Sequence, residues 1–171
     1  MEIKRAWGYP NKNTFDIKPI REFILKHIEG EITIDPFANK NKIARITNDL
    51  DPDYETNYHM DAIDFIKKFK NESVDFILFD PPYSPRQVSE SYKKLGKTVN
   101  RETTQTTYWS NLKREIARVL KKDGGVISFG WNSGGIGKNL GFEIKEILIV
   151  AHGGWHNDTI CTFEKKKEGL K

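Results

Sequence analysis

Hydrophobic residues recur along the chain at two different spacings. Apolar side chains fall at helical intervals in three segments, which are residues 18–28, 62–69 and 108–120. Shorter apolar runs, typical of strands, lie at 31–35, 43–46, 73–80, 126–131, 143–151 and 159–164. The run at 73–80 is almost continuously apolar, as expected of a strand that is covered on both faces. Asp61 precedes the second helical segment and is predicted to cap it.

Strands and helices alternate along most of this pattern. Such an order predicts an α/β fold with a doubly wound, mostly parallel sheet. A short polar segment separates the runs at 143–151 and 159–164, so an antiparallel C-terminal strand is expected. A parallel crossover takes about a dozen residues or more, and the space between Asp35 and Ile43 is too short for a helical one. We therefore expect the first crossover helix to be missing, or the second strand to lie differently.

The length and composition of the chain exclude several classes of protein. The 171 residues suffice for one domain and not for two, so residues 1–171 are interpreted as a single domain. With 37% hydrophobic and 30% charged residues, the chain is typical of a folded globular protein. No apolar run approaches the roughly 20 residues of a membrane span, and the N-terminal residues lack the apolar region of a signal peptide. Because Cys161 is the only cysteine, an intramolecular disulfide is excluded, and we expect a cytoplasmic protein without membrane contacts.

Acidic residues follow three of the predicted strands, namely Asp35, Asp49 and Asp80. In doubly wound sheets, ligands bind at the carboxyl ends of the strands, near the point where the strand order switches. A ligand site is therefore expected where these three carboxylates meet. Asp49 is suited to accept hydrogen bonds from both hydroxyls of a ribose. An aspartate beside Asp51 and Pro52 is also typical of a turn.

Asp80-Pro81-Pro82-Tyr83 follows the most apolar strand directly. Two prolines fix the backbone, so the Asp80 carboxylate and the Pro81 carbonyl face one point in space. Two convergent acceptors suit an aromatic amine, because accepting both N–H bonds localises the nitrogen lone pair for attack on an electrophile. Tyr83 offers a flat face on which an extracted base stacks. The alternative is a rigid turn that only ends the strand.

This tetrapeptide resembles the catalytic signature of the DNA amino-methyltransferases, in which Asp, Asn or Ser precedes Pro-Pro and an aromatic residue. Other segments resemble further motifs of that family, in the same order along most of the chain: Asn13–Ile20, Ile34–Ala38, Asp49–Tyr54 and Asp61-Ala62. The resemblance implies a Rossmann-like class I methyltransferase fold, with S-adenosylmethionine as the cofactor. It assigns catalysis to Asp80, Pro81, Pro82 and Tyr83.

The same resemblance places a set of residues around the cofactor. They are Asn13, Thr14, Lys18, Asp35, Phe37, Asn39, Asp49, Leu50, Asp61 and Ala62. Structural alternatives stay open, since Phe37 suits a core aromatic residue, Asp61 a helix cap and Lys18 an exposed lysine of a first turn. Asn39 and Asn41 stand where the family has glycines. Asparagine tolerates the left-handed backbone better than other residues with a side chain, but its Cβ hinders close approach to a ligand.

The resemblance says least about recognition of the target. Related enzymes carry a separate recognition domain, and the space between Asp61 and Asp80 is too short for one. The net charge of +4 and the pI near 9.0 are compatible with a nucleic-acid partner. The long polar segment 84–104 is interpreted as a phosphate-binding loop or a solvated loop, and its basic residues are Arg86, Lys93, Lys94, Lys97 and Arg101. A homodimer or a separate recognition partner is the other source of specificity.

His152-Gly153-Gly154-Trp155-His156 is interpreted as a loop between antiparallel strands and not as a metal site, because further ligands at suitable spacing are missing. Trp131 and Trp155 suit either the wall of a base pocket or the core.

The sequence thus predicts transfer of a methyl group from S-adenosylmethionine to the N6 amino group of adenine in DNA. Three alternatives stay open: cytosine N4 as the target, adenine in RNA, and a non-catalytic nucleic-acid-binding module with an altered cofactor loop.

Overall fold

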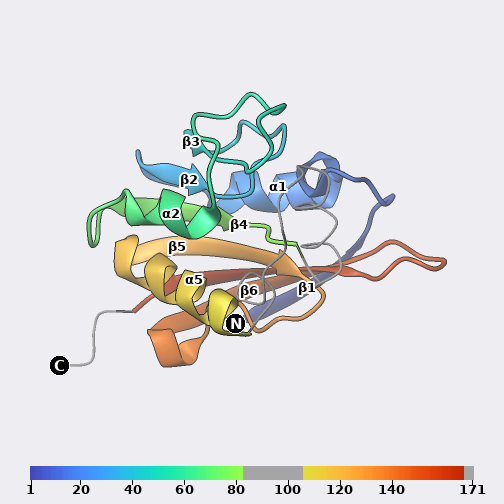
Figure 1. Ribbon diagram of the computed structural model, residues 1–171. Helices are drawn as coiled ribbons and strands as arrows, with labels where there is room; N and C mark the ends of the chain where they lie inside the picture. Colours follow the sequence, from blue (N-terminus) through green and yellow to red (C-terminus); the bar gives the residue numbers. More distant parts are fainter. Residues whose placement is uncertain (83–105, 168–171) are drawn as a thin grey trace.

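The computed structural model describes residues 1–82 and 106–167. A central sheet separates the helices, with α1 on one face and α2 and α5 on the other (Figure 1). The elements are β1 (Glu2–Trp7), a 3-10 turn (Thr14–Asp16), α1 (Lys18–His27), β2 (Thr33–Asp35), β3 (Ile46–Thr47), α2 (Ala62–Lys67), β4 (Val74–Phe79), α5 (Thr106–Val119), β5 (Leu120–Gly130), a second 3-10 turn (Lys138–Leu140), β6 (Phe142–Ala151) and β7 (Thr159–Lys166). None of the helices within the described ranges is long and apolar enough to cross a membrane.

The strands form one sheet in the order β1-β6-β7-β5-β4-β2-β3. β7 runs antiparallel to its neighbours β5 and β6, whereas the remaining neighbours are parallel. The predicted fold class, with its antiparallel C-terminal strand, is thereby confirmed. The chain passes from β2 outward to β3 and then returns to β4 on the other side of β2. The strand order therefore switches between β2 and β4, which is where a doubly wound sheet binds its ligand.

Side chains of β4 alternate between the two faces of the sheet and build both halves of the core. Phe76 and Leu78 pack in the cluster that includes α1. Ile77 and Phe79 pack in the cluster that includes α2 and α5. Every residue of this strand except Asp75 is buried. Burial on both faces explains why the sequence shows a nearly continuous apolar run here rather than an alternating one.

The connection from β2 to β3, residues 36–45, contains no helix, as predicted. β3 is only two residues long and begins at the end of the predicted 43–46 strand. The side chain of Asn48 supplements this short ladder. Its amide donates to the carbonyls of Pro36 and Met60, both at 3.0 Å, and its oxygen accepts the N–H of Met60 at 3.1 Å. A side chain thus holds the outer edge of the sheet where backbone pairing is minimal.

Two features differ from the sequence pattern. β1 pairs with β6 at the sheet edge, although its side chains are mostly exposed and show no apolar alternation. α5 ends at Val119, close to the end of the predicted helix 108–120, and the chain passes directly into β5. Residues 121–124 of β5 form a bulge, because Leu120 pairs with Val74 and Gly125 already pairs with Phe76. A Cβ on Gly125 would lie 2.4 Å from the Phe76 ring, so only glycine fits there. The bulge is set by the pairing with β4, so the apolar pattern of residues 120–125 does not predict it.

Candidate functional site

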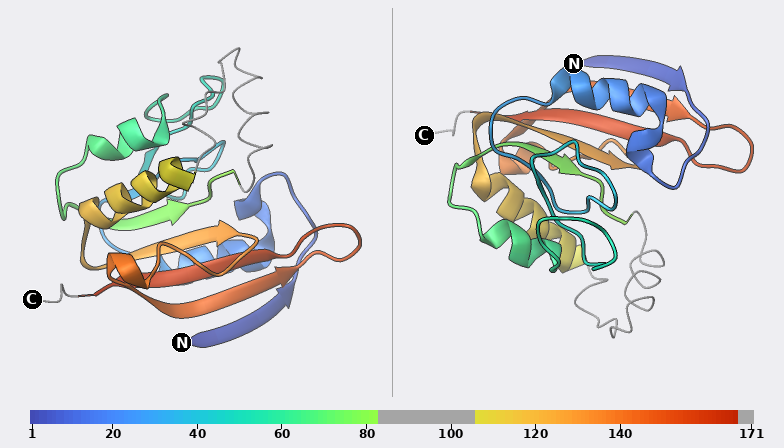
Figure 2. Two further views of the ribbon diagram at one scale, coloured as in Figure 1. Left: turned by 60° about the horizontal axis from the view of Figure 1, so that its bottom comes forward. Right: turned by 90° about the horizontal axis from the view of Figure 1, so that it is seen from above.

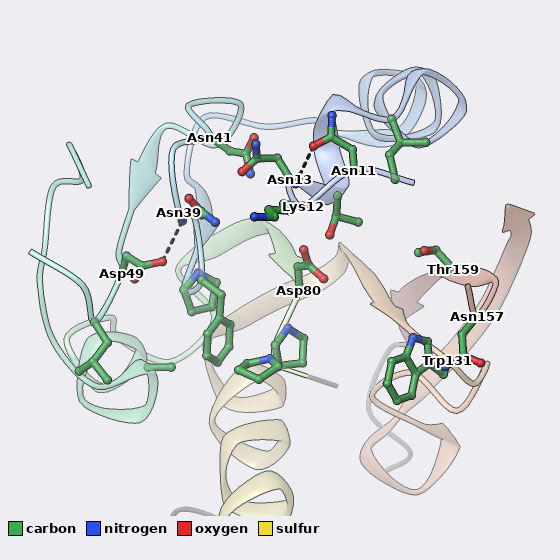
Figure 3. A pocket seen from close by; sticks show the side chains of 18 of the residues that line it. Asn11, Lys12, Asn13, Asn39, Asn41, Asp49, Asp80, Trp131, Asn157 and Thr159 are labelled. Atoms are coloured by element: carbon green, nitrogen blue, oxygen red, sulfur yellow. Dashed lines mark hydrogen bonds between the residues drawn. The ribbon is translucent and has the colours of Figure 1, made fainter. Parts of the chain in front are cut away.

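A cavity of about 680 Å³ opens at the carboxyl ends of β2 and β4 (Figure 3). Its walls come from the segment before α1, the loops after β2 and β3, the end of β4, the start of α5 and the loop between β6 and β7. Its volume lies within the range of small-molecule sites, about 300–1,000 Å³. The cavity thus occupies the place that the strand order predicts for a ligand.

Most residues that the sequence assigns to the cofactor line this cavity. They are Asn13, Thr14, Phe37, Asn39, Asp49, Leu50, Asp61 and Ala62. Lys18 and Asp35 do not line it. The Lys18 side chain is 87% exposed and lies 4.0 Å from Glu22 on the helix surface. Asp35 is buried, next in the sequence to Pro36, which does line the cavity.

Asp49 joins the loop after β3 to the loop after β2. One carboxylate oxygen accepts the N–H of Asn39 at 2.8 Å, and the other accepts the N–H of Asp51 at 2.9 Å. Asn39 has a φ of 54°, the left-handed conformation that asparagine tolerates, whereas Asn41 does not have a positive φ. Burial raises the pKa of Asp49, and the two N–H donors oppose that effect. Because each carboxylate oxygen can accept a second hydrogen bond, Asp49 keeps capacity for ligand hydroxyls.

Asp35 supports the turn that presents Phe37 to the cavity. One oxygen of its carboxylate accepts the Phe37 N–H at 3.0 Å. The other oxygen is buried and has no hydrogen-bond partner among the residues that the structure describes. Burial, with smaller contributions from the charges of Asp80 and Asp49, holds the pKa of Asp35 well above its ordinary value. The Phe37 ring lies 6.0 Å from that of Phe79, measured between centroids.

Asp61 caps α2, as predicted. One of its oxygens accepts the N–H of Ile63 at 2.9 Å, and the other accepts the Tyr108 hydroxyl at 3.0 Å. The second bond ties α2 to α5 at the mouth of the cavity. Ala62 follows in the same wall and adds an apolar surface. A role for Asp61 and Ala62 in cofactor binding stays a prediction.

Asp80 lies near the middle of the cavity (Figure 3). Asn39 and Asp49 lie on one side of it, and Trp131 and Asn157 on the other. Pro81 and Pro82 continue the wall below. The catalytic assignment of these three consecutive residues stays a prediction. Tyr83 and the predicted phosphate-binding residues lie outside the described ranges, and the latter are Arg86, Lys93, Lys94, Lys97 and Arg101.

Several lining residues were not assigned to the site from the sequence. The side chain of Lys12 reaches into the cavity between Asn13 and Asp80 (Figure 3). The residues around Lys12 in the sequence do not predict this position, because it depends on the pairing of β1 with β6 at the edge of the sheet. Tyr108 and Trp109 enter from α5, where their spacing is that of core residues. The sequence suggested Trp131 and Trp155 for either a pocket or the core, and both line the cavity.

His152 connects the two segments that close one end of the cavity. One ring nitrogen lies 2.8 Å from the Gly8 carbonyl oxygen, and the other lies 2.8 Å from the Thr159 hydroxyl. Residues 152–158 connect β6 and β7, so the prediction of a loop between antiparallel strands is confirmed. Within residues 1–82 and 106–167, no three His, Cys, Asp or Glu side chains are grouped to hold a metal ion. His152 therefore holds the segment before α1 against β7.

The fold of this chain is similar to that of known structures. The structure of TrmN from Thermus thermophilus matches 88% of this chain with a TM-score of 0.55 at 18% identity. The match covers 49% of TrmN, so the chain spans about half the length of that protein. The 1,6-didemethyltoxoflavin-N1-methyltransferase of Burkholderia thailandensis, solved with S-adenosylhomocysteine, matches 88% of this chain and 78% of its own, with a TM-score of 0.60 at 10% identity. No protein-family model and no curated protein sequence matches. At these identities the similarity concerns the fold, and the chain has the fold of the class I methyltransferases.

Proposed function

We propose that this chain transfers a methyl group from S-adenosylmethionine to the exocyclic amino group of a nucleic-acid base, adenine N6 in DNA. The observation that carries the proposal is the position of Asp80-Pro81-Pro82. The segment ends β4 at the strand switch and lies between two chemically different halves of one cavity. A methyl transferase that acts on a base needs a cofactor side and a target side that meet at the acceptor nitrogen.

The residues on the Asp49 side fit S-adenosylmethionine. Asp49, which follows β3, offers carboxylate oxygens to ribose hydroxyls. Carboxylates at the equivalent strand end of nucleotide-binding sheets commonly make this charge-assisted pairing. Leu50, Ala62 and Phe37 supply apolar surface for an adenine ring. Lys12, whose side chain reaches into the cavity, is suited to the carboxylate end of the cofactor. When bound, the cofactor supplies an electrophilic methyl group on a sulfonium, and this is the chemistry that the protein does not provide itself.

The protein's own contribution is made by Asp80 and the Pro81 carbonyl. One oxygen of the Asp80 carboxylate and the Pro81 carbonyl oxygen each accept an N–H of the target amine. These two hydrogen bonds localise the lone pair of the amine nitrogen and orient it toward the methyl group. After transfer the nitrogen bears an extra proton, and the Asp80 carboxylate is placed to accept it. Trp131 and Trp155, on the target side, offer flat apolar faces to a base that has left its stack. Catalysis is therefore mainly positioning, together with electrostatic stabilisation of the developing positive charge.

The proposal is tested by methyl transfer from labelled S-adenosylmethionine to oligonucleotides that contain adenine or cytosine as the only amino acceptor. We expect Asp80→Ala to lower turnover by about 100-fold or more, because a key acceptor in the transition state is lost. Calorimetric binding of S-adenosylmethionine and the melting temperature should stay close to wild type. Asp53→Ala is the matched control, since it removes an exposed carboxylate outside the cavity.

Turnover of Asp80→Ala above about a tenth of wild type would contradict the role of Asp80. Transfer to cytosine alone, or to RNA alone, would move the assignment to another base or another nucleic acid. Nucleic-acid binding without any binding of S-adenosylmethionine would identify a non-catalytic module and overturn the proposal.

A further inference from the structure

Three large aromatic side chains are exposed beside the target side of the cavity. Trp7 ends β1 and is 55% exposed, Tyr9 follows it and is 77% exposed, and Trp155 in the loop between β6 and β7 is fully exposed. The rings of Trp7 and Tyr9 meet edge to face, with centroids 4.4 Å apart. Single exposed apolar residues are ordinary, but a group of aromatic ones at the mouth of a cavity marks an interaction surface. We call these three residues the aromatic shelf.

The two parts of the shelf are joined by backbone pairing. Trp7 pairs with Ala151 in the parallel ladder of β1 and β6, and the Gly8 N–H donates to the Ala151 carbonyl at 3.1 Å. A Cβ on Gly153 would lie 3.8 Å from the Trp7 indole nitrogen, so the loop runs directly past that ring. Both views in Figure 2 show the loop between β6 and β7 extending beyond the end of β1. Trp7, Tyr9 and the loop therefore belong to one surface.

The conformation of the loop places Trp155 at the tip. Gly153 and Gly154 both have positive φ, 69° and 59°, a conformation that favours glycine. The turn leaves the Trp155 ring in solvent while the residue still lines the cavity. A tryptophan held in water gains nothing for the fold, because its apolar surface stays hydrated. The exposed ring is thus available to a ligand that extends out of the cavity.

The shelf continues into the cavity and carries positive charge. After Tyr9, the chain enters the cavity wall at once with Pro10 and Lys12. Arg5 is exposed two residues before Trp7, on the same face of β1 because strand side chains alternate. Flat aromatic faces with cations beside them are what unpaired bases and their phosphates require. Bases inside a duplex are already stacked on one another and cannot use such a surface.

We propose that the aromatic shelf stacks unpaired bases next to the target nucleotide, so that the protein prefers single-stranded over duplex nucleic acid. This inference rests on the proposed function, because it takes the cavity as the site of the target base. The nucleotides beside the target leave the cavity past Trp155 and stack on Trp7 and Tyr9, while Arg5 faces the phosphates. The shelf thereby supplies substrate binding from residues of the catalytic domain itself.

The experiment measures fluorescence anisotropy of labelled oligonucleotides: a single-stranded tetramer, a single-stranded dodecamer and the same dodecamer as a duplex, each with one adenine. The wild type should bind the single-stranded dodecamer more tightly than both others. Trp7→Ala combined with Tyr9→Ala should weaken binding of this dodecamer by about 5-fold or more, because each stacked base contributes roughly 1–3 kcal/mol. Binding of the tetramer should change little, and the salt dependence should stay the same because no phosphate contact is removed.

Leu25→Ala is the matched control, since Leu25 is 56% exposed on α1 and away from the shelf. Trp7→Phe, with Tyr9 unchanged, should bind the single-stranded dodecamer as the wild type does, because phenylalanine keeps a flat ring on which a base can stack. If the double variant does not reach the wild-type melting temperature, Tyr9→Ala alone gives the test, because Tyr9 follows β1 and takes no part in its ladder. Unchanged dodecamer binding in a folded shelf variant overturns the proposal, as does equal affinity of the wild type for the duplex.

The outcomes separate this inference from the proposed function. Length-dependent binding that is lost in the shelf variants, without methyl transfer to any oligonucleotide, supports the shelf and overturns the methyltransferase assignment. Methyl transfer by the wild type, together with unchanged oligonucleotide binding in the shelf variants, supports the methyltransferase assignment and overturns the shelf. If sedimentation shows a wild-type dimer that the double variant cannot form, and dodecamer binding is unaffected, the shelf is an interface between copies and the proposal is wrong.

Discussion

Glu146 and Asp35 are both buried carboxylates, and their surroundings are opposite. Glu146, in the middle of β6, lies 3.1 Å from Lys4, 2.6 Å from Lys26 and 2.8 Å from His27. Burial would raise the pKa of Glu146, but these neighbours outweigh it and hold that pKa at about 2. Asp35, at the end of β2, accepts one N–H and lies near other carboxylates, and burial holds its pKa well above the ordinary value.

The difference separates the part of the sheet that maintains the fold from the part that faces the cavity. Glu146 connects β6 to β1 through Lys4 and to α1 through Lys26. At the carboxyl edge, Asp35 and Asp49 form no ion pair with any lysine or arginine of the described ranges. Buried carboxylates with raised pKa values cluster where a protein acts on a ligand. The carboxylates at the cavity thus carry an electrostatic cost, which for Glu146 on β6 is offset by its ion pairs.

The largest expected effect comes from removing the charge of Glu146. Glu146→Gln should lower the free energy of unfolding by about 2 kcal/mol at pH 7, because charge-assisted bonds to two lysines are lost. Urea denaturation measures the change. Glu143→Gln is the control, because Glu143 pairs with Lys145 on the exposed side of the same strand and should change stability by less than about 0.5 kcal/mol. Equal losses in both variants would show that burial of Glu146 is irrelevant.

The Glu146 effect should also depend on pH. Its folded-state pKa of about 2 is depressed, so its contribution is fully present above the unfolded-state pKa and is lost as the pH falls through about 2. The unfolded-state value is about 4.3. The stability gap between the wild type and Glu146→Gln should therefore narrow below about pH 4. A gap that stays constant from pH 6 to pH 2 would contradict the ion-pair explanation.

A smaller effect is expected at the cavity, and it concerns the ligand. Asp49→Ala should raise the dissociation constant for S-adenosylmethionine by about 10-fold, or about 1.4 kcal/mol, through loss of the ribose acceptors. Asp49→Asn keeps one acceptor oxygen and should lose less. Calorimetric titration provides the measurement, with Asp53→Ala as the control for a nearby exposed carboxylate. Unchanged affinity in Asp49→Ala would reduce Asp49 to a residue that only holds the Asn39 turn.

The smallest effect is expected for Asp35→Asn, and its sign is diagnostic. The amide keeps an acceptor for the Phe37 N–H, so stability at pH 4 should stay within about 1 kcal/mol of wild type. The pKa of Asp35 is raised, so its contribution to stability is present below the unfolded-state pKa and is lost as the pH rises through the folded-state value. The stability of Asp35→Asn relative to the wild type, measured by thermal denaturation, should therefore increase between pH 4 and pH 8.

Asp75 provides the matching control at the other end of β4. It pairs with Lys121 at 2.6 Å and accepts the N–H of Ile32, and although burial opposes them these contacts lower its pKa. Asp75→Asn should therefore lose stability relative to the wild type as the pH rises through the acid range. If both variants shifted in the same direction with pH, the contrast between paired and unpaired carboxylates would not hold.

Local rules account for much of what the sequence predicted. The apolar runs specify β2, β4, β5, β6 and β7, Asp61 caps α2, and Asn39 adopts the left-handed turn. The short distance between β2 and β3 excludes a crossover helix. Each of these features depends on a few neighbouring residues, so the pattern of the sequence suffices to predict it.

The remaining features depend on partners that lie far away in the sequence. β1 has no apolar pattern because it lies at the sheet edge and meets the core only through Ala6. Lys12 reaches the cavity and Lys18 does not, although Lys18 belongs to the matching motif, because the path of the chain from β1 decides which lysine faces inward. The roles of the site residues toward cofactor and base stay predictions until ligands are bound.

The pairing of β1 with β6 also affects the order in which the molecule folds. Glu2 lies opposite Glu146, so this parallel ladder closes a loop that contains most of the chain. Long loops close late, because the entropy of closure must be overcome before the contacts form. β2 and β3, by contrast, pair across a short connection. We therefore expect Tyr9 and Lys12 to reach their places after β6 has joined the sheet, and hydrogen exchange should show the earliest native-state opening at β1.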